Sequence, residues 1–276
     1  MGKFNAALLQ ISVYDNKEKN INNAVSMIEQ VSKEGADIAI LPEMFCCPYD
    51  NSYFKAFGEE EGGFAYKAMS KAAKEFGIYV VAGTIPELEG DEVYNTSYVF
   101  NKKGEQIAKH RKMHLFDIDV KDGQYFKESD TFTPGSDITV FETEFCKIGL
   151  AVCYDVRFPE LSRLMVNEGA EVIIIPGAFN MTTGPAHWEL HFRARALDNQ
   201  VYTIGVAPAR DYEASYRSYG NSIIASPWGN VLNRMDENQG YIIQEIDVDY
   251  VRKVRNELPL LNHRRQDVYS LNKINK

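Results

Sequence analysis

Three ionisable side chains in this sequence directly follow segments that have the pattern of strands: Glu43, Lys112 and Cys153. Cys153 ends an apolar run at 148–152, and Pro159 shortly after it suits the first turn of a helix. A strand that turns sharply into a helix after a cysteine presents the thiol at the carboxyl edge of a sheet, where a nucleophile is accessible. A carboxylate, an ammonium and a thiol at such edges are the groups that a thiol-dependent acyl transfer requires.

The chemistry assigns a role to each of these groups. A free thiol is mostly protonated at neutral pH, and the thiolate attacks, so Cys153 needs a base or a cation beside it. Glu43 can accept the proton and return it to a leaving amine, while Lys112 can stabilise the thiolate and then an oxyanion. The backbone N–H of Tyr154 is a second oxyanion donor, because this residue follows the nucleophile. Glu128 is a further carboxylate that can hold the Lys112 ammonium or a substrate amide.

Each residue also has a structural explanation. A cysteine at the end of a strand is often a small buried hydrophobe, and a glutamate or lysine in a loop is usually a solvated charge. His110 and His114 suggest a Cys–His pair, although the mechanism above needs no histidine. The conjunction of three such residues at strand ends favours the catalytic interpretation.

The elements that must position these residues alternate between strands and helices. Strands are expected at 4–11, 38–41, 79–85, 94–101, 106–110, 139–142, 147–152, 172–175, 201–206, 222–226 and 240–246. Helices are expected at 17–33, 64–76, 159–168, 186–199 and 247–256, with long loops at 42–63, 111–137 and 176–185. The strands are largely continuous apolar runs and helices recur between them, which predicts an α/β protein with buried sheets covered by helices.

The composition indicates the class of protein and its domain organisation. The 276 residues are 45% hydrophobic and 25% charged, which is ordinary for a globular protein. No linker divides the chain, so we expect a single domain over 1–276, with 257–276 as a C-terminal tail. The net charge of −9 argues against a broad nucleic-acid-binding face.

The sequence also predicts where the protein is located and whether it binds a metal. No apolar run reaches membrane-spanning length and the N-terminus lacks a signal-peptide pattern, which predicts a cytoplasmic protein with no membrane contact. The four cysteines form no C-x-x-C pair, so no zinc or thioredoxin-like site is indicated. Adjacent Cys46 and Cys47 are expected to pack, since neighbouring cysteines rarely bridge.

Three segments resemble the signature blocks of the nitrilase superfamily of carbon–nitrogen hydrolases: Leu-Pro-Glu at 41–43, Arg-Lys-Met-His-Leu-Phe at 111–116, and Gly-Leu-Ala-Val-Cys-Tyr-Asp-Val-Arg-Phe-Pro-Glu at 149–160. The resemblance covers almost the whole chain. It implies a four-layer α-β-β-α sandwich, a homodimer that continues the sandwich, and no metal or organic cofactor. Carried over by motif, Glu43 is the base, Lys112 the oxyanion stabiliser and Cys153 the nucleophile, while Glu128 matches an additional active-site glutamate.

Further segments are similar to the omega-amidase branch of that superfamily, at 94–96, 114–120, 176–190 and 198–202. This similarity implies hydrolysis of the terminal amide of short dicarboxylic monoamides (2-oxoglutaramate, 2-oxosuccinamate and succinamate) through a cysteine thioester. Such a substrate carries a carboxylate that needs a cationic or hydrogen-bonding partner. Arg157 is one candidate and Arg193 and Arg195 are others, although Arg157 can instead form a structural salt bridge with Asp155 or Glu160.

Other residues are expected to line the substrate pocket. Tyr49 can supply a hydroxyl to the pocket or simply pack within its loop. The loop after the strand at 172–175 is either a plain connection or contributes Phe179, Asn180, Met181 and Thr183 to the site. His187 and Trp188 are expected to pack rather than react.

Three alternative functions remain open. The first is another amidase of the superfamily, acting on deaminated glutathione or on N-carbamoyl amino acids. The second is a binding or scaffold protein that keeps the fold without catalysis. The third is a nitrilase proper, for which the sequence offers no positive reason.

Overall fold

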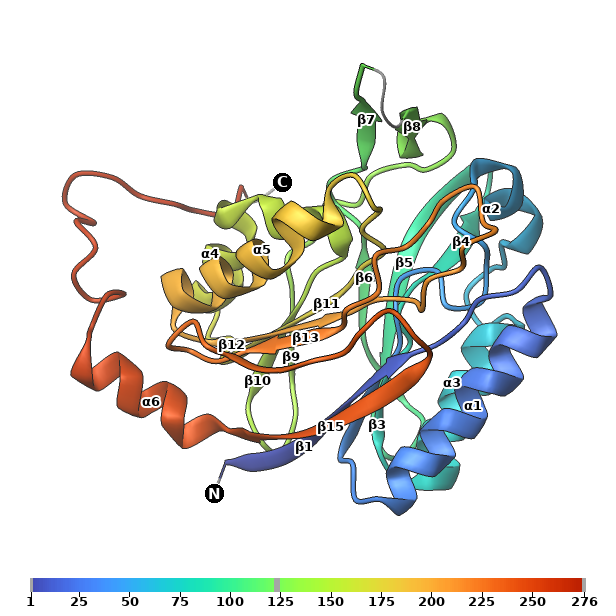
Figure 1. Ribbon diagram of the computed structural model, residues 1–276. Helices are drawn as coiled ribbons and strands as arrows, with labels where there is room; N and C mark the ends of the chain where they lie inside the picture. Colours follow the sequence, from blue (N-terminus) through green and yellow to red (C-terminus); the bar gives the residue numbers. More distant parts are fainter. Residues whose placement is uncertain (1, 122–124, 275–276) are drawn as a thin grey trace.

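The computed structural model describes residues 2–121 and 125–274 (Figure 1). The first half of the chain contains β1 (Lys3–Gln10), α1 (Lys17–Lys33), β2 (Ile38–Ile40), α2 (Asn51–Phe57), α3 (Phe64–Phe76), β3 (Tyr79–Val81), β4 (Ile85–Glu89), β5 (Glu92–Phe100), β6 (Gln106–Arg111), β7 (Asp117–Asp119) and β8 (Tyr125–Lys127). The second half contains β9 (Thr139–Glu142), β10 (Lys147–Leu150), α4 (Pro159–Asn167), β11 (Val172–Pro176), α5 (Gly184–Asn199), β12 (Tyr202–Val206), β13 (Ile223–Ala225), β14 (Val231–Arg234), β15 (Gly240–Asp247) and α6 (Val248–Glu257). Two short 3-10 helices span Glu128–Asp130 and Cys153–Arg157.

The strands form two large sheets. One has the order β15-β1-β2-β3-β5-β4, with β6 paired to β5, and the other has the order β14-β13-β12-β11-β10-β9. The centre of each sheet is parallel, with β1, β2 and β3 in one and β10, β11 and β12 in the other. The crossover helices lie on the outside, where α1 and α3 cover the first sheet and α4 and α5 cover the second (Figure 1).

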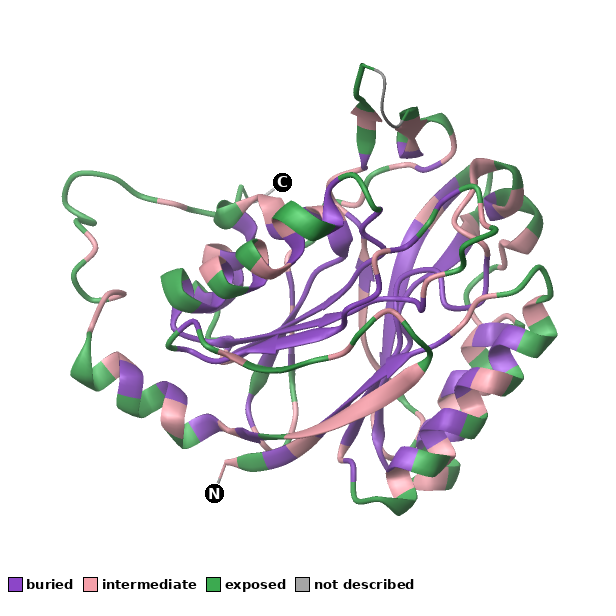
Figure 2. Ribbon diagram, in the orientation of Figure 1, coloured by how far each residue is buried: buried purple, intermediate pink, exposed green. Residues whose placement is uncertain are grey.

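The alternation of side chains along each central strand creates the four layers. In β1, Phe4, Ala6 and Leu8 point into the core between the sheets, whereas Ala7 and Leu9 point toward the helices. Because both faces of these strands are covered, their central positions are mostly apolar on both faces. Figure 2 shows the result as buried strands flanked by helices whose outer faces are exposed. The predicted α-β-β-α sandwich is therefore confirmed.

The expected strand at 79–85 is wrong, because the chain breaks at Gly83. Its φ is 30°, and a Cβ at this position would lie 2.0 Å from the carbonyl oxygen of Pro42. Only glycine permits this close approach, which holds the end of β3 against the residue that precedes Glu43. After the break, β4 and β5 form a hairpin that the continuous apolar pattern concealed.

Two of the expected loops contain regular structure. The segment at 42–63 includes α2, whose first turn is capped by the Asp50 side chain accepting the N–H of Ser52. The segment at 111–137 includes the β7–β8 hairpin and the 3-10 helix that begins at Glu128. These elements are too short for hydrophobic periodicity to reveal them.

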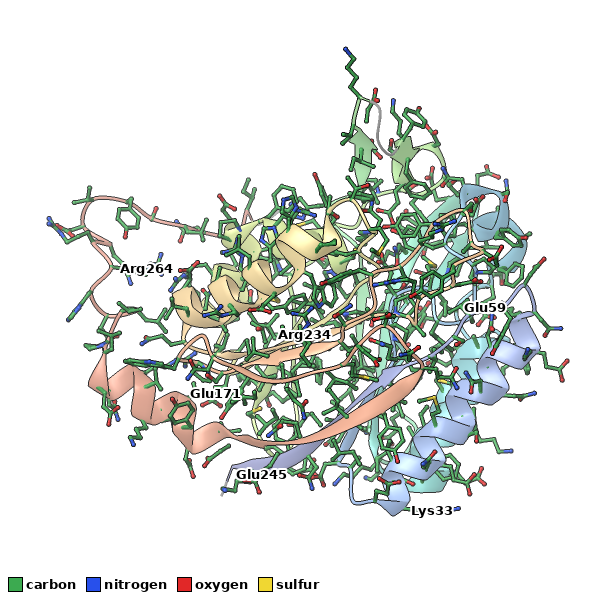
Figure 3. All side chains as sticks on the ribbon, viewed as in Figure 1. Lys33, Glu59, Glu171, Arg234, Glu245 and Arg264 are labelled. Carbon is green, nitrogen blue, oxygen red and sulfur yellow. The ribbon has the colours of Figure 1, made fainter. Side chains whose placement is uncertain are left out.

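Ion pairs lie on the surface of the molecule. Figure 3 labels Lys33, which pairs with Glu29 at 2.7 Å, and Arg234, which pairs with Glu189 at 2.8 Å. Such exposed pairs contribute little to stability. No helix among residues 2–121 and 125–274 is long and apolar enough to cross a membrane.

Candidate active site

The structure brings Glu43, Lys112, Glu128 and Cys153 together in the interior. Glu43 and Lys112 lie just beyond β2 and β6 of the first sheet, whereas Cys153 lies just beyond β10 of the second. At most 3% of the surface of any of the four residues is exposed. Buried ionisable groups must be paired, so this cluster needs a chemical explanation.

The backbone at Cys153 adopts a conformation that is rare for a residue with a side chain. Its φ is 47°, in the left-handed region, and the residue opens the 3-10 helix Cys153–Arg157. The neighbouring strand end leaves room for this turn, since a Cβ on Gly177 would lie 3.3 Å from the Cys153 Cα. Strained backbone of this kind is characteristic of functional sites, and here it ends the strand at the thiol.

Lys112 lies between two carboxylates. Its Nζ is 2.9 Å from Oε1 of Glu43 and 2.7 Å from Oε2 of Glu128, and all three side chains are fully buried. Burial alone would lower the pKa of Lys112, but the negative charges of Glu128 and Glu43 outweigh it and raise that pKa. The ammonium is therefore permanently charged at neutral pH.

Glu43 is held at both carboxylate oxygens. Oε1 accepts hydrogen bonds from Asn95 at 2.9 Å and from Lys112, while Oε2 accepts the backbone N–H of Ala178 at 2.8 Å. A carboxylate fixed in this way has one orientation relative to Cys153. Asn95 lies in β5 beside the polar residues Thr96 and Ser97, so its polarity alone did not identify it as a site residue.

Glu128 is held by a different set of donors. Tyr49 donates its hydroxyl at 2.8 Å, and the backbone N–H of Phe116 donates at 2.6 Å. Burial raises the pKa of Glu128, and Glu43 adds to this effect while Lys112 opposes it. Tyr49 thus reaches the site, where it orients Glu128 beside the ammonium.

The thiol of Cys153 is neutral in this environment. Burial raises its pKa well above the ordinary value, the nearby Glu43 carboxylate raises it further, and Lys112 only partly compensates. The geometry therefore suits a thiol whose proton leaves for a base as the sulfur attacks, rather than a preformed thiolate.

We expect the resting protein to show no thiolate absorbance from Cys153 at about pH 7.5. Since the pKa is raised, the thiolate fraction must lie below the few per cent that a free cysteine shows. The ultraviolet difference spectrum between the native protein and Cys153→Ala measures this directly. A thiolate band that disappears in the variant would contradict the proton-transfer geometry.

A second buried network joins the two sheets behind the thiol. The Asp155 carboxylate lies 3.3 Å from Nε2 of His110 and 2.7 Å from Nδ1 of His114, and it also accepts the backbone N–H of Val152 at 2.9 Å. Burial alone would raise the pKa of Asp155, but the hydrogen bonds with the histidines outweigh it and lower that pKa. Both histidines, which flank Lys112 in sequence, direct a ring nitrogen at Asp155, so they support the turn that carries the nucleophile.

A small cavity adjoins the thiol. It is narrow, and it is lined by Phe116, Cys153, Tyr154, Arg157, Phe179, Thr183 and Tyr216. Tyr216 also lines an adjacent pocket of about 380 Å³, together with Asn180 and the 40%-exposed Met181. Tyr216 lies in a polar loop without any pattern, and no sequence signal identified it.

Arg157 lies in this cavity, and it forms no salt bridge with Asp155 or Glu160. Its guanidinium carbon is 4.7 Å from the centroid of the Phe179 ring. Within residues 2–121 and 125–274, no carboxylate is paired with it. The structural salt bridge that the sequence left open is therefore not what the structure shows.

The other two candidate arginines do not reach the cavity. Arg193 donates to the carbonyl of Gly229 at 2.8 Å, and Arg195 donates to the carbonyl of Val156 at 2.8 Å. Both support the packing of α5. Trp188 is fully buried and packs as expected, whereas its neighbour His187 contacts Arg157.

The cysteines form no disulfide bond, and no metal-binding cluster is found among the described residues. All four cysteines are buried and unbridged. In the part of the chain that the structure describes, no group of histidine, cysteine and acidic side chains has an arrangement that would hold a metal ion.

Comparison with known proteins defines the class. Residues 5–256 match the carbon–nitrogen hydrolase family. The fold resembles that of yeast Nit3, a member of branch 10 of the nitrilase superfamily, with a TM-score of 0.88, 38% identity, and coverage of 96% of this chain and 97% of that one. It also resembles the Caenorhabditis elegans NitFhit protein, with a TM-score of 0.89, 30% identity, and coverage of 98% and 67%. The chain belongs to the carbon–nitrogen hydrolase family and is an amidohydrolase that acts on C–N bonds.

Curated relatives of similar length share more of the sequence than these solved structures do. The chain is 46% identical over 271 residues to omega-amidase NIT2 of Xenopus tropicalis, covering 98% of each protein. It is 41% identical to the human protein of the same name, again with 98% coverage of both. It is 46% identical over 275 residues to nitrilase homolog 2 of Dictyostelium discoideum, covering 99% of this chain and 84% of that protein.

Proposed function

We propose that this enzyme is an omega-amidase that hydrolyses short dicarboxylic monoamides to the dicarboxylate and ammonia. The expected substrates are succinamate, 2-oxosuccinamate and 2-oxoglutaramate. The observation that carries the proposal is the cation of Arg157, which shares a cavity with Cys153 and has no carboxylate partner in the described residues. The names of the relatives at 41–46% identity support the same assignment.

The first half of the proposed reaction forms a thioester. Sγ of Cys153 attacks the amide carbon while Glu43 accepts the thiol proton. Lys112 and the backbone N–H of Tyr154 stabilise the oxyanion of the tetrahedral intermediate. Glu43 then donates the proton to the departing nitrogen, the C–N bond breaks and ammonia leaves.

The second half regenerates the enzyme. Glu43 accepts a proton from water as the oxygen attacks the thioester carbon, and the C–S bond breaks with return of the proton to Cys153. Glu128 keeps Lys112 in place throughout, since it contacts the ammonium at 2.7 Å.

The pocket residues have distinct proposed roles. Arg157 binds the far carboxylate of the substrate, and Phe179 and Thr183 line the cavity beside it. Asn180 is a second donor, because its buried Nδ2 has no hydrogen-bond partner in the described part of the chain. Met181 lies at the exposed side of the adjacent pocket, so we assign it to substrate entry.

The narrowness of the cavity favours short substrates. Phe116, Phe179 and Tyr216 leave little free space beside the thiol, which suits a small acyl group better than a peptide-length one. Deaminated glutathione and N-carbamoyl amino acids also carry carboxylates, so they remain the natural comparison substrates.

We propose in addition that 1–276 form one domain with 257–276 as its tail, and that the enzyme is a homodimer. Exposed Leu190 and Leu197 on α5, with 64% and 43% of their surfaces accessible, support a dimer contact on this outer layer. A cytoplasmic location stays a prediction from the sequence.

Ammonia release from succinamate and 2-oxoglutaramate tests the assignment. We expect Arg157→Met to raise the KM for succinamate by about 10–100-fold, because it removes a charge-assisted partner of the carboxylate. N-carbamoyl-β-alanine and deaminated glutathione serve as competing substrates in the same assay. If the enzyme turned over one of these two substrates but neither succinamate nor 2-oxoglutaramate, the omega-amidase assignment would be overturned. Only membership of the wider family would then stand.

A further inference from the structure

We propose that His187 and His191 form a neutral clamp that positions Arg157 and thereby determines selectivity for amides that carry a carboxylate. The proposal rests on the omega-amidase function above and identifies what makes that function selective. Neither histidine lines the cavity beside the thiol, so both act through Arg157 as positioning residues.

The clamp engages one nitrogen of the guanidinium. Nη1 of Arg157 is 3.0 Å from Nδ1 of His187 and 3.1 Å from Nε2 of His191. The two histidines lie one turn apart on α5, so they face the same side of the helix. A guanidinium can only donate, so both imidazole nitrogens must accept, and the two N–H groups of Nη1 are both used.

This arrangement leaves the opposite edge of the guanidinium for a ligand. Nε of Arg157 is buried and has no hydrogen-bond partner in the described residues. Nε and the second terminal nitrogen form the fork that matches a carboxylate with two parallel hydrogen bonds. The rings of Phe179 and Tyr154, whose centroids are 4.7 Å and 5.4 Å from the guanidinium carbon, restrict its plane.

The neutrality of the clamp is the important property. Burial lowers the pKa of His187 and also that of His191, the latter to about 4, and the charge of Arg157 adds to both effects. Both rings are therefore uncharged at neutral pH. An acidic residue in the same place would hold Arg157 equally well, but it would neutralise the cation and repel the substrate carboxylate. Two neutral acceptors fix the arginine and leave its charge available.

Matched substrates isolate this effect. Succinamate and butyramide have the same carbon chain and the same amide, and only succinamate carries the carboxylate. The selectivity is the ratio of their kcat/KM values, which a general loss of folded or active enzyme leaves unchanged. Because the carboxylate lies far from the reacting bond, we expect changes to appear in the KM for succinamate rather than in kcat.

Isosteric variants then separate charge from shape. In His191→Gln, the amide oxygen can accept where Nε2 did, and in His187→Asn it can accept where Nδ1 did. We expect both to keep most of the selectivity. His191→Glu differs from His191→Gln only by a negative charge next to Arg157, and we expect it to lower the selectivity at least about tenfold. The double variant His187→Leu and His191→Leu removes both acceptors, and we expect its selectivity to fall by a similar factor.

The outcomes distinguish the clamp from the underlying function. Suppose that the native enzyme hydrolyses succinamate and that His191→Glu and His191→Gln have equal selectivity. This result overturns the clamp and leaves the omega-amidase assignment intact. Equal loss in His191→Gln and His191→Glu also overturns it, since the acceptor would then not be what matters. Native enzyme that turns over neither monoamide overturns the proposed function, and the clamp with it.

Discussion

Replacing Cys153 by alanine should abolish ammonia release from succinamate, with a loss of at least about 10⁴-fold in kcat. The reason is that the proposed reaction passes through a bond to Sγ, and Cys153 is the one cysteine among the residues that line this cavity. Alanine keeps the same backbone preferences as cysteine at a φ of 47°, so the turn should survive. Coupled ammonia detection measures the rate, and circular dichroism checks the fold.

Cys146→Ala is the matched control for this experiment. Cys146 is also a buried free thiol, but it belongs to the core between the sheets, away from the cavity. We expect it to retain activity within a few-fold, with a modest loss of stability of about 1 kcal/mol from the lost contacts. Residual turnover by Cys153→Ala comparable to that of Cys146→Ala would show that Cys153 is not the nucleophile.

Replacing Lys112 by methionine should remove activity and also destabilise the fold by roughly 3–5 kcal/mol. The variant keeps the volume of the side chain but leaves Glu43 and Glu128 buried together without a cation. Burial already raises the pKa of Glu128 with Lys112 present, and removing the ammonium raises it further. Chemical denaturation of both proteins gives the difference in the free energy of unfolding.

The pH dependence of that difference has a definite sign. A carboxylic acid whose folded pKa exceeds its unfolded value of about 4.3 binds more protons in the folded state, so folding stability falls as pH rises through the window between them. The deficit of Lys112→Met should therefore be larger at about pH 8 than at about pH 5. A deficit independent of pH would argue that the cost is one of packing rather than of uncompensated charge.

A double variant separates stability from catalysis. Combining Lys112→Met with Glu128→Gln removes one positive and one negative charge, which restores the net charge of the native cluster. We expect most of the lost stability to return while activity stays absent, because the oxyanion still lacks its ammonium. Recovery of both would contradict the role proposed for Lys112.

The sequence made part of this structure predictable. The central strands were readable because both of their faces are covered, and Glu43, Lys112 and Cys153 stood out because each comes just past the end of an expected strand. Glu128 was a further carboxylate that could hold the ammonium, and the motif resemblance then matched it to an active-site glutamate. The four-layer arrangement followed from the same two kinds of observation.

The rest depended on contacts that have no local pattern. The break at Gly83 is set by the carbonyl of Pro42, which lies far away in the sequence. His187 looked like a packing residue, since nothing near it indicates that Arg157 from another helix would donate to it. Asp155 looked like a partner for that arginine, yet it is bonded to His110 of the opposite sheet and to His114 in the segment that follows it. Tertiary pairing of polar side chains is decided by the assembled fold rather than by neighbours along the chain.

The division of the cluster between the sheets has a consequence for how catalytic power arises during folding. The base and the ammonium come from one sheet and the thiol from the other, so they meet only when the core between the sheets closes. A chain with one sheet formed would hold either an ordinary cysteine or an acid–lysine pair with nothing to activate. Hydrolytic competence is thus expected only once both sheets have formed and packed together.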